Sequence, residues 1–154
     1  MKGEFSYALP RFPPPVIGAS YAMHGSRLLI CGGESEDGAI LNTCYFLDQP
    51  ENGQNDNGTN PQDLKYWIWR KFQNNMNVKR KETAIAALGS KLWIIGGLTS
   101  IESNGLVFEN IDKTTEVFDF DTSTWDYEIQ LDFGLAGHCA IKVHLSKVKL
   151  KIDM

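Results

Sequence analysis

A pair of adjacent glycines ends a short apolar run at two places in the chain. Gly32 and Gly33 follow RLLIC, and Gly96 and Gly97 follow KLWII, so the second pair lies 64 residues after the first. Neither pair belongs to the Gly-Lys-Ser/Thr of a phosphate loop or to the GxGxxG of a dinucleotide fold. A repeated motif constrains the architecture more than any other sequence feature. The chain is therefore expected to contain at least two copies of one structural unit.

Further residues keep the same register in both units. Asp48 and Asp119 each end a short run of aromatic and β-branched residues, which is typical of a strand. Trp69 follows Asp48 after twenty-one residues, whereas Trp125 follows Asp119 after only six. The extra residues of the first unit, at 50–64, are rich in Asn, Gly, Pro and Asp, which predicts a looped-out insertion.

Each unit contains four short apolar runs separated by turn residues, which predicts four antiparallel strands. In the second unit we place these strands at 83–88, 91–96, 114–120 and 124–130. The runs LLIC and LWII do not alternate between apolar and polar residues, so both faces of these strands should be covered. A four-stranded sheet that is covered on both faces and repeated is typical of a propeller blade. We therefore expect an all-β fold, in which the glycine pairs permit sharp turns where neighbouring blades crowd together.

The two units resemble kelch repeats, whose period is about 50 residues. The resemblance rests on an apolar strand closed by Gly-Gly, an aromatic-Asp strand and a following Trp, in LLICGG…YFLD…W and LWIIGG…VFDFDTSTW. It implies kelch-type β-propeller blades of four antiparallel strands, with Trp69 and Trp125 at equivalent places and largely buried between blades. The chain departs from the family pattern at Phe118, where a tyrosine is usual, and its third copy ends without Gly-Gly.

The register divides the chain into two blades with partial blades on either side. The segments are an outer strand and Pro-rich lead-in at 1–15, blades at 16–72 and 73–131, and two strands of a truncated or divergent blade at 132–154. Because closed propellers have about four to eight blades, we predict an incomplete, open propeller. Lysines alternate with apolar residues at 147–151, which suits a solvent-exposed last strand. The alternative to an exposed last strand is a truncated or divergent product whose last blade was never selected to close the ring.

Composition argues against several classes of protein. The chain has 154 residues, 42% of them hydrophobic and 22% charged, as in an ordinary globular domain, and its formal charge of −4 disfavours nucleic-acid binding. No apolar run has the length of a membrane span or of a signal peptide, so we expect a cytoplasmic protein with no membrane partner. Cys31, Cys44 and Cys139 have no close spacing, so neither a disulfide framework nor a zinc site is expected.

The sequence contains no clear catalytic constellation. His24, His138 and His144 are scattered without the HxH or HExxH spacing of metal sites. His138 and Cys139 are neighbours in an expected strand, so their side chains should point to opposite faces. We expect no enzyme activity, no metal and no other cofactor. The alternative is a fragment of an enzyme domain resembling galactose oxidase, a kelch-like copper enzyme that draws several Tyr and His ligands from a complete ring.

The resemblance also implies where a partner would bind. In kelch propellers the loops between the second and third strands, and those between successive blades, project from one face that usually binds a protein. Here these loops are 34–41, 98–112 and 74–82. Because binding residues concentrate on loops held by a rigid scaffold, we expect a non-catalytic protein-protein interaction module, a kelch-type scaffold or adaptor fragment.

Five residues of these loops are candidates for binding a protein partner. Lys79, Arg80 and Lys81 form the only basic triplet in an acidic chain and would hold an acidic peptide by charge-assisted hydrogen bonds. We add Glu102 and Asn104 from the loop 98–112. The alternative is that the triplet is a solvated turn, since exposed charges usually contribute little. We also predict self-association through the open sheet edges.

Overall fold

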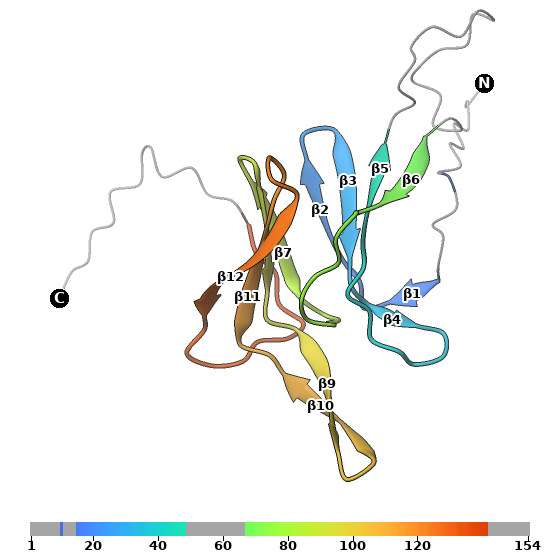
Figure 1. Ribbon diagram of the computed structural model, residues 1–154, viewed down its shortest axis with the longest axis vertical. Helices are drawn as coiled ribbons and strands as arrows, with labels where there is room; N and C mark the ends of the chain where they lie inside the picture. Colours follow the sequence, from blue (N-terminus) through green and yellow to red (C-terminus); the bar gives the residue numbers. More distant parts are fainter. Residues whose placement is uncertain (1–9, 11–14, 49–66, 142–154) are drawn as a thin grey trace, which may run out of the picture.

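The structure is a computed structural model that describes residue 10 and the ranges 15–48 and 67–141. These residues form β-strands and no helix, which confirms the expected all-β class (Figure 1). In the described part, therefore, no helix is long and apolar enough to cross a membrane. The predicted insertion at 50–64, the outer strand before residue 10 and most of the last partial blade lie outside the described residues. The cytoplasmic location stays a prediction.

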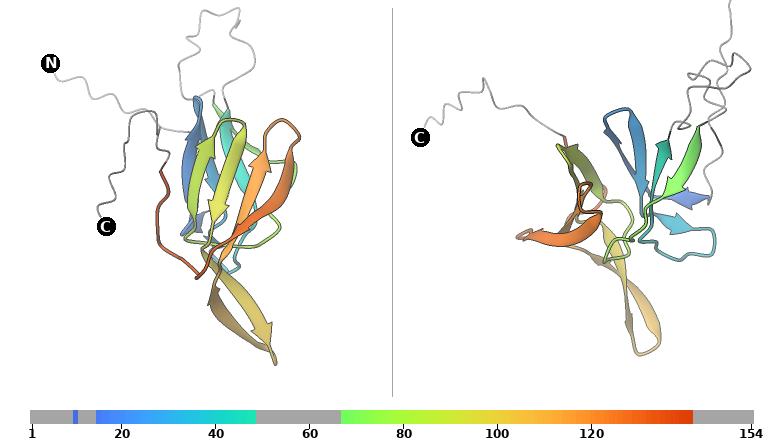
Figure 2. Two further views of the ribbon diagram at one scale, coloured as in Figure 1. Left: turned by 90° about the vertical axis from the view of Figure 1, so that its left-hand side faces the viewer. Right: turned by 45° about the horizontal axis from the view of Figure 1, so that its top comes forward.

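Two four-stranded antiparallel sheets stand side by side and form the blades (Figures 1 and 2). Blade 1 contains, in spatial order, β2 (Ser20–His24), β3 (Arg27–Cys31), β5 (Cys44–Asp48) and β6 (Ile68–Lys71). Blade 2 contains β7 (Ala84–Leu88), β8 (Lys91–Ile95), β11 (Thr114–Asp119) and β12 (Thr124–Gln130). The four strands predicted for blade 2 are thus confirmed to within a residue at each end.

Two smaller sheets lie at one end of the blades. β1 (Val16–Ile17) pairs with β4 (Glu34–Ser35), and β9 (Leu98–Ser103) pairs with β10 (Leu106–Ile111). The β9–β10 hairpin lies within the predicted loop 98–112 and projects away from both blades (Figures 1 and 2). Residues 98–111 thus form a hairpin where only a loop was expected from the sequence.

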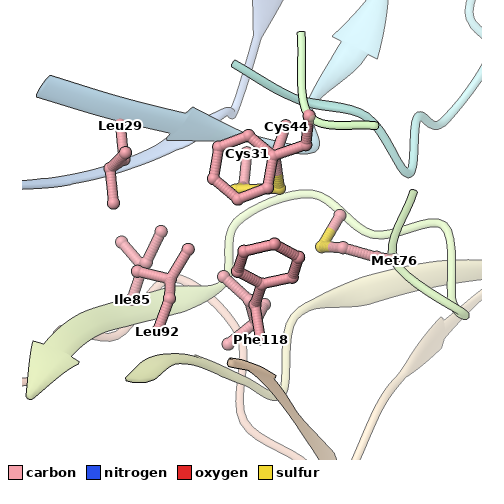
Figure 3. Close-up of a cluster of buried hydrophobic side chains, with 9 residues drawn as sticks. Leu29, Cys31, Cys44, Met76, Ile85, Leu92 and Phe118 are labelled. Atoms are coloured by element: carbon pink, nitrogen blue, oxygen red, sulfur yellow. A yellow bond between two sulfur atoms is a disulfide. The ribbon is translucent and has the colours of Figure 1, made fainter. Parts of the chain in front are cut away.

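The hydrophobic core lies between the blades. Its residues come from blade 1, from the segment that connects the blades and from blade 2, and Figure 3 shows most of them converging: Leu29, Cys31, Cys44, Phe72, Met76, Ile85, Leu92, Ile94 and Phe118. The ring of Phe72 packs 4.7 Å from that of Phe118 and 5.7 Å from that of Phe46, so it joins the two sheets. Burying one such side chain contributes roughly 1.5–3 kcal/mol, so this interface holds the blades together.

The first glycine of each pair occupies a position that other residues would not fit. Gly32 and Gly96 have φ angles of 67° and 59°, and a Cβ there would lie 2.2 Å from the carbonyl oxygen of Arg80 and 2.5 Å from that of Leu135. These carbonyls belong to the segments that follow each blade. The backbone needs the left-handed conformation and the missing side chain at once. The predicted crowding at the strand end is confirmed.

The tryptophans occupy equivalent places in the two blades, as predicted. Trp69 lies opposite Leu47 and Trp125 lies opposite Phe118. Each indole nitrogen donates a 3.0 Å hydrogen bond to a carbonyl that precedes its blade, from Trp69 to Pro10 and from Trp125 to Asn74. Both side chains are half-buried, not largely buried as expected, because β6 and β12 are the outer edge strands.

The aspartates that end β5 and β11 have different surroundings. Asp48 is buried and forms ion pairs with Arg27 at 3.3 Å and Arg70 at 3.2 Å. Asp119 accepts hydrogen bonds from the backbone amides of the turn that follows it, including that of Asp121 at 2.8 Å. Asp48 thus neutralises arginines of the two neighbouring strands, β3 and β6, whereas Asp119 stabilises the turn that follows β11.

Cys31 and Cys44 form a disulfide, so the expectation that the chain has none is wrong. The two residues are directly opposite each other on β3 and β5, with their Cα atoms 4.1 Å apart, and both are buried (Figure 3). The two cysteines are 13 residues apart along the chain, so their spacing gave no sign of a bond. The register of β3 and β5 brings them together. Cys139 is an exposed free thiol.

The described part of the predicted third blade, at 132–141, contains no strand. This segment instead runs back along blade 2. Leu135 accepts a 2.7 Å hydrogen bond from the Gly97 amide, and the Gly137 amide donates a 2.9 Å bond to the Glu82 carbonyl. In blade 1, the Gly33 amide likewise donates a 3.0 Å hydrogen bond to the Arg80 carbonyl. The segment after blade 2 therefore packs against its blade as the connection near Arg80 packs against blade 1.

Candidate protein-binding face

The three predicted loops meet around one hollow. Its volume is about 310 Å³, and it is lined by side chains from the loop 34–41, from the end of the connecting segment and from the β9–β10 hairpin: Glu34, Gly38, Ala39, Ile40, Lys79, Lys81, Ser100, Val107 and Glu109. These segments are far apart in the sequence and share one end of the blades (Figure 1). The prediction that they project from the same face is confirmed.

Lys81 ties the hairpin to the loop 34–41. Its Nζ lies 2.5 Å from Glu34 Oε2 and 2.6 Å from Glu109 Oε1, and only 14% of its side chain is exposed. Hydrogen bonds to Glu109 and Glu34 raise the pKa of Lys81 above its ordinary value. The backbone of Lys81 also exchanges hydrogen bonds of 2.9 and 2.8 Å with Leu98 at the base of β9. Two carboxylates therefore already neutralise this cation.

Arg80 is fully buried, so for this residue both the prediction that it binds an acidic partner and the alternative of a solvated turn are wrong. Its Nη2 lies 2.8 Å from Glu116 Oε1 and 3.4 Å from Asp112 Oδ2, and its Nη1 donates to the carbonyls of Gly96 at 2.8 Å and Thr114 at 3.2 Å. A buried guanidinium needs these acceptors, because an unpaired charge in the interior is costly. Arg80 holds the blades together.

Glu116 completes this arrangement from β11. Its side chain is fully buried and accepts hydrogen bonds from the backbone amides of Asn77 at 2.6 Å and Val78 at 3.0 Å, as well as from Arg80. We call Arg80, Asp112 and Glu116 the Arg80 cluster. It attaches the connection after blade 1 to the third strand of blade 2, so the base of the binding face is fixed.

The remaining predicted residues lie on different parts of the face. Lys79 is exposed and lines the hollow. Glu102 is opposite Val107 in the hairpin and shares its side. Asn104, with φ of 54°, forms the tight turn at the hairpin tip with Gly105, as Asn-Gly pairs commonly do. The structure thus brings Lys79 and Lys81 together and places Asn104 at the far end of the hairpin.

The hairpin also carries an apolar surface that was not expected from the sequence. Ile101 and Phe108 are directly opposite each other, and Leu106 lies two residues from Phe108 on the same side. All three are exposed, Phe108 at 52%. We call these three residues the hairpin patch. Strand side chains alternate between sides, so the patch lies opposite the side of Val107 and Glu109, which lines the hollow. The apolar residues within LVFENI were the available signal.

The described residues contain no group of three or more His, Cys, Asp or Glu side chains arranged to hold a metal ion. His24 instead lies between the blades, where its ring stacks on Phe120 with the ring centroids 4.0 Å apart. His138 lies beside the glycine pair of blade 2, 3.2 Å from where a Cβ on Gly96 would stand. Both histidines therefore occupy packed positions at blade boundaries.

Comparison with known proteins agrees with this geometry. The kelch motif matches residues 79–128, which contain all four strands of blade 2 up to Glu128. Blade 2 thus matches the kelch motif. Comparison with curated protein sequences gave no match.

The fold of most of the chain is similar to that of a solved structure, the kelch-repeat protein YjhT. The TM-score is 0.63 at 20% sequence identity, and the match covers 88% of this chain and 34% of YjhT. The chain therefore spans about a third of the length of that propeller. The likeness at this identity concerns the fold, and it confirms that the two blades have the fold of part of a kelch propeller.

Proposed function

We propose that the chain is a non-catalytic protein-interaction module, of scaffold or adaptor type, that binds a protein through the hairpin patch. The observation that carries this proposal is the exposure of Ile101, Leu106 and Phe108 on a hairpin that contributes nothing to the core. Contiguous exposed apolar side chains rimmed by polar ones mark interaction sites. The hairpin base is held by Lys81, so little order would be lost on binding.

Of the three basic residues expected to hold an acidic peptide, one is free to do so. Arg80 is buried and Lys81 is paired with two carboxylates, which leaves the exposed Lys79 as the cation that would meet an acidic group of the partner. A single charge at the rim changes association rate and salt dependence more than affinity. We therefore assign the main binding energy to the apolar hairpin patch.

The test compares two exposed aromatic residues after a partner has been isolated and purified. Phe108→Ser should weaken binding by about tenfold or more, because truncating a central aromatic contact usually costs more than ~1.4 kcal/mol. Tyr127→Ser, which removes an exposed aromatic ring on β12, is the matched control and should bind like the wild type. Equal affinities for Phe108→Ser and the wild type would contradict the proposal.

The alternative of a galactose-oxidase-like enzyme fragment is tested separately. Metal analysis of the purified chain should find no stoichiometric copper. Copper at one ion per chain would contradict a non-catalytic module and would make the tyrosine and histidine side chains candidate copper ligands.

A further inference from the structure

The outer face of blade 1, on the side away from blade 2, is apolar and exposed. Tyr21 is 74% exposed, Met23 is also exposed, and Leu28 and Ile30 beside them are half-buried. We call these four residues the outer face of blade 1. A hollow of about 560 Å³ lies on it, lined by Val16, Gly18, Ala19, Tyr21, Leu28 and Ile30. The binding proposal uses none of these residues.

The repeat shows what a face of this kind contacts. The residues of blade 2 that lie 64 positions after Tyr21, Leu28 and Ile30 are Ile85, Leu92 and Ile94. Ile85, Leu92 and Ile94 are buried in the core between the blades, Leu92 and Ile94 completely. Blade 1 covers them. The outer face of blade 1 is thus built from the positions that, one repeat later, receive the preceding blade.

The opposite end of the chain presents the complementary face. Ala86, Leu88 and Trp93 lie on the side of blade 2 away from blade 1, and Leu88 is exposed. We call these three residues the outer face of blade 2. Their equivalents in blade 1 are Ala22, His24 and Leu29, all of which contact blade 2 or the core between the blades. His24 also contacts the Gly89 carbonyl at 2.9 Å.

We propose that copies of this chain dock head to tail, with the outer face of blade 1 of one copy on the outer face of blade 2 of the next. This contact repeats the interface already present between the two blades of one chain. A head-to-tail interface generates a closed ring when its rotation closes, and propeller rings close at about four to eight blades. The two described blades of one copy match 34% of YjhT, so three docked copies of this pair of blades would supply one ring.

Light scattering after size-exclusion chromatography tests the assembly on the full chain. The expected mass is about 52 kDa, three times the 17.3 kDa of one chain. A single-chain mass at every concentration up to the solubility limit would overturn the docking. A two- or four-chain mass would overturn the three-copy ring.

Two variants test the polarity of the contact. Tyr21→Asp and Leu88→Asp alter exposed residues on the two different faces, and each variant alone should be a single chain. An equimolar mixture should form a two-chain complex, because one intact copy of each face remains. Phe108→Ser should keep the wild-type mass, which separates this proposal from partner binding. A mixture that stays monomeric, or variants that keep the wild-type mass, would overturn head-to-tail docking.

Discussion

Blade 1 and blade 2 have the same backbone plan but fasten the same corner by different chemistry. In blade 1, Cys31 and Cys44 are opposite each other where β3 and β5 meet, and a disulfide joins them. In blade 2 the equivalent pair on β8 and β11 is Ile95 and Thr115, which form no covalent link. The Arg80 cluster lies beside that corner instead.

The two fastenings act over different distances. The disulfide joins two neighbouring strands of one blade, so it restrains blade 1 internally. The Arg80 cluster joins the connection after blade 1 to β11 of blade 2, so it restrains one blade against the other. The two blades thus place a stabilising interaction at the same position of the repeat. The side chains at that position determine whether it joins two strands of one blade or one blade to the other.

The largest effect should come from breaking the fastening between the blades. Arg80→Met removes the cation and leaves the carboxylate of Glu116 buried without its charged partner, which typically costs about 3–5 kcal/mol. Urea denaturation followed by tryptophan fluorescence measures this loss. Lys79→Met, one residue away and exposed, should change stability by less than about 0.5 kcal/mol. Similar stabilities for the two variants would mean that the cluster does not hold the blades.

The second glycine of each pair should be less tolerant in blade 2 than in blade 1. A Cβ at Gly97 would lie 2.4 Å from Thr83 Cγ2 and 2.6 Å from the Lys81 carbonyl, whereas one at Gly33 would meet no atom closer than 3.0 Å. Gly97→Ala should therefore cost about 2–4 kcal/mol by denaturation, more than Gly33→Ala. Gly89→Ala, with a left-handed φ but open space, is the control at about 1 kcal/mol. A Gly89→Ala cost as large as that of Gly97→Ala would show that φ alone matters.

Removing the disulfide should make the corner of blade 1 resemble that of blade 2. The link closes a short loop, so the double variant Cys31→Ala, Cys44→Ala should lose about 2–3 kcal/mol of stability. Alkylation of the unreduced, denatured wild type should modify only Cys139, and Cys139→Ala should be as stable as the wild type. Modification of three thiols per chain would contradict the bond.

The smallest effect should come from the ion pairs at the binding face. Lys81→Met should cost about 0.5–1 kcal/mol, as expected for a pair near the surface. Because the folded-state pKa of Lys81 is raised, its contribution is complete below the unfolded value of about 10.5 and falls as pH rises toward the folded value. The stability difference between the wild type and Lys81→Met should therefore be constant at neutral pH and shrink above pH 10.5. A difference that grows with pH would contradict this assignment.

The backbone of the blades could be predicted from sequence because it rests on local rules. The glycine pairs, the aspartates and the tryptophans each mark one place in the repeat, and the structure has them there. The disulfide was missed because it depends on which residues face each other across strands. Aligning Cys31 and Cys44 around the loop 32–43 would have paired them.

The role of Arg80 could not be read from its neighbours. Lys79, Arg80 and Lys81 look alike in sequence, yet they are exposed, buried and half-buried. The available signal was at a distance, in TTEVFDF, where Glu116 is a charge in the middle of a predicted strand, whereas Asp119 is at its end. Such a carboxylate requires a buried partner, and the nearest arginine before it is Arg80.

The Arg80 cluster also has a consequence for the order in which the chain is made. Arg80 leaves the ribosome 36 residues before Glu116, and the amides of Asn77 and Val78 precede it by 39 and 38 residues. Until β11 has been synthesised, the carboxylate of Glu116 that accepts hydrogen bonds from the Asn77 and Val78 amides and from Arg80 is missing. Domains usually complete their folding from the N-terminus as synthesis proceeds. Here the connection after blade 1 cannot take its final packing before the third strand of blade 2 emerges. We therefore expect the pair of blades, and not the single repeat, to be the unit that matures during translation.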